Sequence, residues 1–247
     1  MLNQAARLAD HILTVSDSTR RDLIQEFNIN PEKITVTYEG VGESFRPLKD
    51  TQIIQQTLSR HQLKSPYFLY VGMIKEHKNI HWLLRLYRKW KKAGKIQSSL
   101  VLVGPMDSNY LKKFPEDFKI HSGEGIFHLP SIPQEDLVAL YSGATGLIHP
   151  SLYEGFGLTL LEAMACGTPV VALRTGSIPE VAGEAADLVN VDDEKEFERA
   201  VCRLESDPNH RTLLSERGIE QAKKFRWQEM AAKTAAVYDR LLQNEGV

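Results

Sequence analysis

The sequence predicts an α/β fold built on a doubly wound, mostly parallel Rossmann-like sheet. Two observations predict it. Short apolar or β-branched runs alternate with amphipathic stretches long enough to be helices, and glycine directly follows the runs that end at Val71 and Val103. Parallel strands need long crossover connections, which are usually helices. Because such sheets bind ligands beyond the carboxyl ends of their strands, we expect any site at those turns.

The apolar runs and the amphipathic stretches follow one another in order along the chain. Strands are expected at 67–71, 100–103, 126–129, 146–149, 170–173 and 187–189. Helices are expected at 79–93, 134–142, 158–166, 194–206, 208–225 and 227–242. Gly167 and Pro169 are typical of the end of one helix and the start of the next strand.

The first 47 residues follow the same pattern but are too short to enclose a core. They predict a helix at 2–9, a strand at 11–15, a helix at 19–27 capped by Ser18, and a strand at 34–38. We therefore expect residues 1–47 to be a truncated remnant of a second α/β domain and a hinge, with a ligand-binding domain at 48–226. The alternative is that the N-terminal segment is an extension packed on the main domain. A final helix at 227–247 is expected to pack back toward the N-terminal part.

Composition places the chain among ordinary globular proteins. It has 247 residues, of which 42% are hydrophobic and 25% charged, and its formal net charge is −2. This charge gives no electrostatic reason to expect nucleic acid. No apolar run is long enough to span a membrane, and the polar residues after Met1 argue against a secretion signal. The two cysteines lie in helical patterns, so we expect a cytoplasmic protein with reduced thiols.

The segment from Glu154 to Val171 carries the strongest functional signal. Gly155 and Gly157 allow backbone N–H groups to approach a ligand, and a helix beginning near Leu158 directs free N–H groups and its dipole at the same place. Glu154 and Glu162 flank this loop, and carboxylates commonly accept hydrogen bonds from sugar hydroxyls. A phosphate flanked by sugars predicts a nucleotide sugar. The alternative is that Glu162 is only an exposed helix residue.

Neighbouring side chains could add contacts to this anion site. Thr159 offers a hydroxyl in the first helical turn, and Ser151 could reach a phosphate. Phe156 and Leu158 are expected to pack and to offer only backbone groups. His149 ends a strand beside the loop, where a structural role is favoured over a catalytic one. Glu180 is expected on a short surface helix, with a sugar contact as the alternative.

A second loop, residues 72–79, follows the first strand of the large domain. It begins with Gly72 and contains Lys78, our first choice for a phosphate contact, with Lys75 or His77 second. The alternative is a solvated basic loop. Neither a dinucleotide fingerprint nor a P-loop motif occurs here, which disfavours dehydrogenase and kinase functions. No DxD triplet and no His/Cys cluster with metal spacing occurs, so we expect neither a metal nor a cofactor.

These segments together resemble a known family. HPSLYEGFGLTLLEAMACGTPVVA is similar to the hallmark segment of family 4 retaining glycosyltransferases of the two-domain GT-B type, and YVGMIKEHKNI to their phosphate loop. ADHILTVSDSTRRDLIQEF and ITVTYEGVGESFRP resemble the end of that family's N-terminal, acceptor-side domain and its hinge. The resemblance implies that this chain is the donor-side part, preceded by little of the acceptor side.

The resemblance also implies roles for individual residues. Glu154, the catalytic candidate, would contact and orient the donor hexose. Glu162 would contact the ribose, and Lys78 the diphosphate together with the backbone of 157–159. The remaining donor-binding candidates are Gly72, Lys75, His77, Gly104, Ser131, Ile132, Ser151, Phe156, Gly157, Leu158 and Thr159, with Ser131 and Ile132 beside the base. Many members carry Arg directly after the strand glycine, where this chain has Met73.

The resulting hypothesis is transfer of a hexose from a nucleoside diphosphate sugar to a glycan or lipid-linked acceptor, with retention and without a metal. A UDP-sugar is slightly favoured over GDP-mannose on frequency alone. The alternatives are a nucleotide-sugar binding module that is inactive by itself and a nucleotide-sugar epimerase of the same fold. Peripheral association with the inner face of a membrane, through a domain not in this sequence, is left open.

Overall fold

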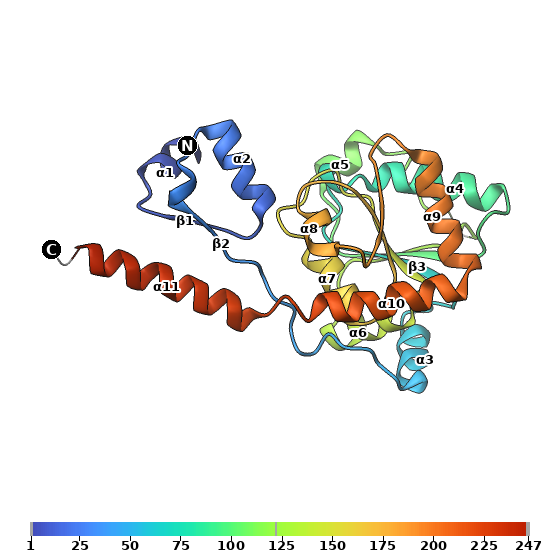
Figure 1. Cartoon of the computed structure of the whole chain (residues 1–247). Helices are drawn as coiled ribbons and strands as arrows, with labels where there is room; N and C mark the ends of the chain where they lie inside the picture. The colour runs from blue at the N-terminus through green and yellow to red at the C-terminus, as the bar shows by residue number, and fades with distance from the viewer. Residues whose placement is uncertain (1, 122, 246–247) are drawn as a thin grey trace.

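A computed structural model describes residues 2–121 and 123–245 of the chain. Its larger part is a six-stranded parallel sheet covered by helices on both faces (Figure 1). The strands are β3 (Tyr67–Val71), β4 (Ser99–Val103), β5 (Ile126–Leu129), β6 (Gly146–His149), β7 (Val170–Leu173) and β8 (Asp187–Val189). The predicted doubly wound sheet is confirmed, and the predicted strand bounds agree to within one residue.

The order of the strands contains a switch point between β3 and β6. The sheet runs β5-β4-β3-β6-β7-β8, so the chain builds outward in one direction from β3 and then returns to build outward in the other direction from β6. Phe68 and Leu69 of β3 pair with Gly146 and Leu147 of β6. Because the loops after these two neighbouring strands leave in opposite directions, a binding crevice is expected between them.

Both faces of the sheet are buried. Tyr67, Leu69 and Val71 of β3 belong to one apolar cluster, and Phe68 and Tyr70 to another. The first cluster includes residues of α3 (Thr51–Arg60), α6 (Gln134–Gly143), α7 (Leu158–Ala165) and α8 (Ile178–Ala182). The second includes residues of α4 (Ile80–Lys92), α5 (Ser108–Lys113) and α9 (Glu194–Ser206), and α10 (Pro208–Ala222) packs on α7 and α9. Burial on both faces explains why the strands are unbroken apolar runs.

Three local features differ from the sequence prediction. Helix α3 was not expected because its sequence is mostly polar, and only Ile54, Thr57 and Leu58 are buried. The short α5 was also missed. Helix α2 is capped by Ser16 instead of Ser18: the Ser16 side chain accepts a hydrogen bond from Thr19 N. The N-cap position needs the extended backbone that Ser16 adopts, whereas Ser18 already lies within the first turn.

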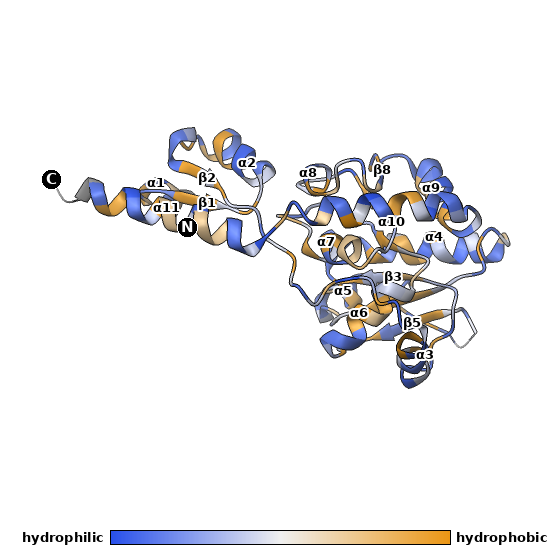
Figure 2. Ribbon diagram, turned by 60° about the horizontal axis from the view of Figure 1, so that its bottom comes forward, coloured by the Kyte–Doolittle hydropathy of each residue, from blue (hydrophilic) through white to orange (hydrophobic). Residues whose placement is uncertain are grey.

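The N-terminal segment forms a small separate unit. It contains α1 (Leu2–Leu8), β1 (Ile12–Thr14), α2 (Asp17–Phe27) and β2 (Ile34–Val36), and the two strands pair in parallel. The last helix, α11 (Trp227–Glu245), lies beside this unit (Figures 1 and 2). Arg240 Nη2 is 3.2 Å from the ring nitrogens of His11. The domain limits at 47 and 226 stay a prediction.

Two stretches of chain, 39–47 and 223–227, run between the N-terminal unit and the sheet, and they touch at Gly40. A Cβ atom placed on Gly40 would lie 2.1 Å from Trp227 N, and Val41 N donates a hydrogen bond to Phe225 O at 3.3 Å. Only glycine fits such a close approach of two backbones. This contact holds the two connections together.

The turns after β3 and β4 also depend on glycine. Gly104 has φ +128°, and a Cβ atom there would lie 2.3 Å from Gly72 O. Gly72 N donates to Val103 O at 2.9 Å, and Gly104 N donates to Leu129 O at 2.9 Å. The two turns therefore lie against each other at the edge of the crevice.

We expect Gly104→Ala to lower the free energy of unfolding by roughly 2–4 kcal/mol, because it combines an unfavourable φ with a backbone clash. Chemical denaturation of both proteins measures the difference. Gly94→Ala is the matched control, because Gly94 also has positive φ, +68°, but nothing lies within 4 Å of the added methyl group. Equal losses in the two variants would contradict the assigned crowding.

Candidate functional site

The loops after β3 and β6 meet at the switch point between these strands, where the strand order predicts a binding crevice. The first loop contains a 3₁₀ turn, Glu76–Lys78, and the second runs from Pro150 to Gly157. A backbone hydrogen bond joins them, from Leu152 N to His77 O at 2.8 Å. The two segments that the sequence singled out therefore face each other although more than seventy residues separate them.

A cluster of three ionisable side chains lies at this junction. Lys78 Nζ donates to Glu154 Oε1 at 2.5 Å, with 16% of the lysine side chain and 10% of the glutamate side chain exposed. His149 Nε2 lies 2.9 Å from the same oxygen. The structure thus brings together Lys78, Glu154 and His149, of which the sequence favoured only the first two for ligand binding.

Glu154 is held in its charged form. Burial by itself would raise the pKa of this carboxyl group, but the neighbouring His149 and Lys78 outweigh it and hold the pKa well below its usual range. At neutral pH, Glu154 is therefore a carboxylate that can only accept hydrogen bonds. It suits the binding of hydroxyl groups and does not suit proton donation.

The glycine loop leads into α7 as the sequence predicted. Gly157 has φ +101° at the N-cap, and α7 begins at Leu158. A methyl group on Gly157 would lie 2.8 Å from Ile178 Cδ1, the end of a side chain, so the turn calls for glycine mainly because of its positive φ. The first N–H groups of a helix have no partner within the helix, so those of Leu158 and Thr159 are available to an anion.

Glu162 lies one turn further along α7 and differs electrostatically from Glu154. Burial raises its pKa to about 7, against a smaller opposing effect of the Tyr141 hydroxyl. That hydroxyl donates to Glu162 Oε2 at 3.1 Å. Tyr141 is fully buried in α6, and sequence reasoning missed it because a helical tyrosine carries no functional signal.

The basic loop contributes two charges and one neutral ring. Burial lowers the pKa of His77, and the charges of Lys75 and Lys78 lower it further, outweighing the opposite effect of Glu154. His77 is therefore mainly neutral at pH 7. The positive charge next to the crevice comes from Lys78 and Lys75.

The structure places the other predicted residues around the carboxyl ends of the strands. Gly72 and Gly104 form the adjacent turns described above, and Ser131 and Ile132 follow β5, with Ser131 exposed and Ile132 half-buried. Ser151 Oγ is buried without a hydrogen-bond partner. The Phe156 ring packs in the core, as expected for a residue that offers only backbone groups. Their contacts with a ligand stay predictions.

Glu180 forms its hydrogen bonds with residues outside this cluster. It is on α8, and its carboxylate accepts hydrogen bonds from Asp17 N and Ser18 N, both at 2.9 Å, and from the Tyr38 hydroxyl at 3.0 Å. The predicted short helix is present, but Glu180 on it binds the start of α2 in the N-terminal unit. No pattern in the sequence indicates this pairing.

No group of three or more His, Cys, Asp or Glu side chains suited to a metal ion occurs within residues 2–121 and 123–245. Independence from a metal stays a prediction. In the same part of the chain, no helix is both long and apolar enough to cross a bilayer.

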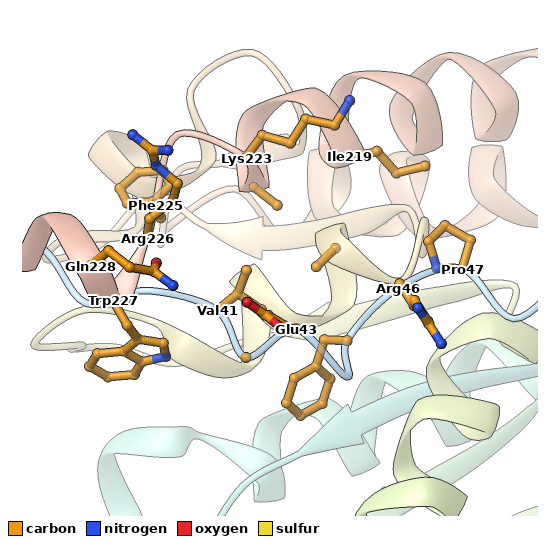
Figure 3. A pocket seen from close by; sticks show the side chains of 14 residues that line it. Val41, Glu43, Arg46, Pro47, Ile219, Lys223, Phe225, Arg226, Trp227 and Gln228 are labelled. Carbon is orange, nitrogen blue, oxygen red and sulfur yellow. The ribbon is translucent and has the colours of Figure 1, made fainter.

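A cavity of about 680 Å³ lies along the two connecting stretches, apart from the strand ends (Figure 3). Its lining includes Val41, Arg46, Lys223, Phe225 and Trp227. None of the predicted donor-binding residues lines this cavity. The cavity therefore lies along residues 41–47 and 219–228 and not at the switch point between β3 and β6.

Several solved structures share this fold. The chain superposes on Anabaena Alr3699/HepE in complex with UDP and glucose with a TM-score of 0.82 and 18% identity, covering 96% of this chain and 65% of that one. It superposes on sucrose-phosphate synthase from Thermosynechococcus elongatus with a TM-score of 0.79 and 24% identity, covering 98% of this chain and 61% of that one. These similarities show the GT-B Rossmann-like fold.

Curated relatives are closer in sequence. The O-antigen chain mannosyltransferase B of Escherichia coli is 33% identical over 241 residues, which cover 96% of this chain and 62% of the relative. The MMP alpha-(1->4)-mannosyltransferase of Mycolicibacterium hassiacum is 31% identical over 250 residues, covering 98% and 57%. This chain therefore spans about three fifths of each relative. The family model for glycosyl transferases group 1 matches residues 52–221, and the chain belongs to this glycosyltransferase family.

Proposed function

We propose that the chain is the donor-binding part of a retaining glycosyltransferase that moves a hexose from a nucleoside diphosphate sugar to a glycan or lipid-linked acceptor. The observation that carries the proposal is the Lys78–Glu154 pair at 2.5 Å, placed between the basic loop and the first turn of α7. A cation, free helix N–H groups and an ionised carboxylate lie within one crevice. This combination suits a diphosphate joined to a sugar.

The proposed contacts to the diphosphate follow from its negative charge. The diphosphate is held by Lys78, with Lys75 second because His77 is mainly neutral, and by the N–H groups at the start of α7. During transfer, negative charge grows on the leaving diphosphate, and these fixed positive groups stabilise it. They would take the place of a metal ion, so we propose that transfer needs none.

The two carboxylates take different hydroxyls. Glu154, ionised and at the end of the glycine loop, orients the hexose, and Glu162 accepts hydrogen bonds from the ribose. We assign Glu154 a hydroxyl-binding role and not that of a covalent nucleophile, because both Lys78 and His149 engage its Oε1 atom. Product with the donor's anomeric configuration, measured by NMR, supports retention.

The names of the relatives support mannose as the first hexose to test, since both are mannosyltransferases. A solved structure with this fold, Anabaena Alr3699/HepE, is in complex with UDP-glucose, which supports testing uridine donors as well. We therefore keep both UDP-sugars and GDP-mannose as candidate donors, and propose that the loop with Ser131 and Ile132 distinguishes the bases.

A second candidate function is a nucleotide-sugar binding module, and the share of its relatives that the chain covers favours it. Because the chain spans about three fifths of its relatives, it could bind donor without transferring the sugar. Incubation with donor alone and with donor plus a glycan acceptor separates the candidates. Transfer only with acceptor supports the enzyme, no turnover with tight binding supports a binding module, and conversion of donor alone supports an epimerase.

We expect isothermal titration calorimetry with UDP, GDP, ADP and their hexose conjugates to show saturable binding of one nucleotide. Lys78→Ala should weaken it by about tenfold to a hundredfold, because a charged hydrogen bond is lost. Glu162→Ala should weaken binding because the acceptor for the ribose hydroxyls is lost. Lys64→Ala, an exposed lysine in the connection to β3, is the control and should leave the affinity unchanged. Wild-type protein that binds none of these ligands would contradict the assigned site.

Binding of the nucleotide sugar should strengthen as the pH rises through about 7, the pKa of Glu162 in the free protein. Below this pH the carboxyl group is protonated and loses one acceptor, so we expect roughly tenfold weaker binding at pH 6 than on the plateau above pH 8. The sugar conjugate is the right ligand because its diphosphate does not titrate in this range. The affinity of Glu162→Gln should not change with pH. If the affinity of this variant depends on pH as in wild type, a group other than Glu162 is responsible.

A further inference from the structure

The Glu180 carboxylate joins two parts of the chain that are about 160 residues apart. Its Oε1 atom accepts a hydrogen bond from Ser18 N, and its Oε2 atom accepts from Asp17 N and from the Tyr38 hydroxyl. Asp17 and Ser18 open α2, so their N–H groups have no partner within the helix and lie at its positive end. Figures 1 and 2 show α2 and α8 side by side.

The turn that begins α8 supports the glycine loop. The fully buried Ser177 donates through Oγ to Glu154 O at 3.1 Å and to Phe156 O at 2.8 Å, and Ser177 N donates to Glu154 O at 3.3 Å. Gly176 is so close that a Cβ atom would lie 2.6 Å from Glu154 O. The backbone of Glu154 is therefore held by the residues immediately before the helix that carries Glu180.

Tyr38 contacts the same loop from the N-terminal side. Its ring centroid is 6.2 Å from that of Phe156 and 5.8 Å from that of Phe225. Burial, followed by the hydrogen bond and charge of Glu180, raises the pKa of Tyr38 to about 12. Its hydroxyl therefore stays a donor across the physiological range. A further contact, from the Tyr153 hydroxyl to Asp22 Oδ2 at 2.8 Å, joins α2 to the residue before Glu154.

We propose that Glu180 is a positioning residue that couples docking of the N-terminal unit to the placement of Glu154. With α2 and Tyr38 bound to Glu180, the turn at 176–177 is fixed and the Glu154 loop is held for the hexose. When this contact opens, the loop loses its support and hexose recognition weakens. The hexose part of the proposal rests on the proposed function, whereas the coupling between the two contacts does not.

The alternative role for Glu180, direct contact with a sugar, is less consistent with its surroundings. Both carboxylate oxygens are already engaged by backbone N–H groups and a phenol. A sugar would have to displace these partners from a helix N-terminus, where a carboxylate is favoured. The geometry therefore gives Glu180 a role between the two parts of the chain.

The test uses the whole chain and the variants Glu180→Gln and Tyr38→Phe. Glutamine keeps the size of the side chain but its NH₂ group cannot accept, so at least one of the three donors loses its partner. Tyr38→Phe removes only the hydroxyl and keeps the ring against Phe156. Glu184→Gln is the matched control, because it removes the same charge from an exposed position just beyond α8.

Hydrogen exchange of the ligand-free proteins gives the first readout. We expect the amides of Asp17 and Ser18 to exchange faster in Glu180→Gln, and the amides of 154–157 to accelerate with them. Glu184→Gln should match wild type. Faster exchange at Asp17 and Ser18 with unchanged exchange at 154–157 would overturn the coupling, because the contact would then be purely local.

Calorimetry gives the second readout. If only the hexose subsite is disturbed, Glu180→Gln should weaken the nucleoside diphosphate sugar about threefold to tenfold while the bare nucleoside diphosphate binds as in wild type. The double variant of Glu180→Gln and Tyr38→Phe should bind the nucleotide sugar no more weakly than the weaker-binding single variant, since both substitutions break the same contact. If Glu180→Gln weakened the sugar conjugate and the bare nucleoside diphosphate equally, the role of Glu180 in hexose recognition would be overturned. If wild type binds no nucleotide sugar, the proposed function fails, and the exchange data alone decide the coupling.

Discussion

The buried ion pair between Lys78 and Glu154 is the interaction on which the site depends. Charges this poorly exposed are costly to remove from water and persist only when paired at good geometry. The pair forms because β3 and β6 are neighbours at the point where the strand order reverses, and because a backbone hydrogen bond holds their loops together. Removal of either partner leaves the other charge buried, so the two loops act as one unit.

Glycine makes this close arrangement possible. Gly104 lets one turn lie against Gly72, Gly157 provides the left-handed cap of α7, and Gly176 admits the backbone of Glu154. At each of these positions a methyl group would lie under 3 Å from its neighbour and the backbone has positive φ. The free N–H groups of α7 and the carboxylate of Glu154 are thus placed by backbone geometry, which a rigid sheet then supports.

Two glutamates eight residues apart have opposite electrostatic environments. Glu154 is buried next to a lysine and a histidine and stays charged, whereas Glu162 is half-buried next to a neutral phenol and has a pKa of about 7. The same desolvation acts on both, so the difference lies in their partners. Different partners therefore give the two carboxylates different charge behaviour, that of Glu154 insensitive to physiological pH and that of Glu162 sensitive to it.

The amino-acid sequence determined the fold class, most element positions and the glycine loop, because these follow from local patterns. Unbroken apolar runs give buried parallel strands, and a glycine followed by an amphipathic stretch gives a turn and a helix. Tyr67–Val71 and the start of α7 at Leu158 agree with the prediction for this reason. Helix α3 was missed because its polar residues resemble a linker and only tertiary contacts bury one side of it.

Only the tertiary structure decided which side chains act together. The contacts of Glu154 with Lys78, of Glu162 with Tyr141, and of Glu180 with the N-terminus of α2 join residues 21 to 163 positions apart. Local patterns carry no information about such pairs, since they depend on strand order and on how the N-terminal unit docks. The sequence therefore predicted a phosphate-and-sugar site at the strand ends, and the packed chain decided how the charges there are paired and which distant residues hold them in place.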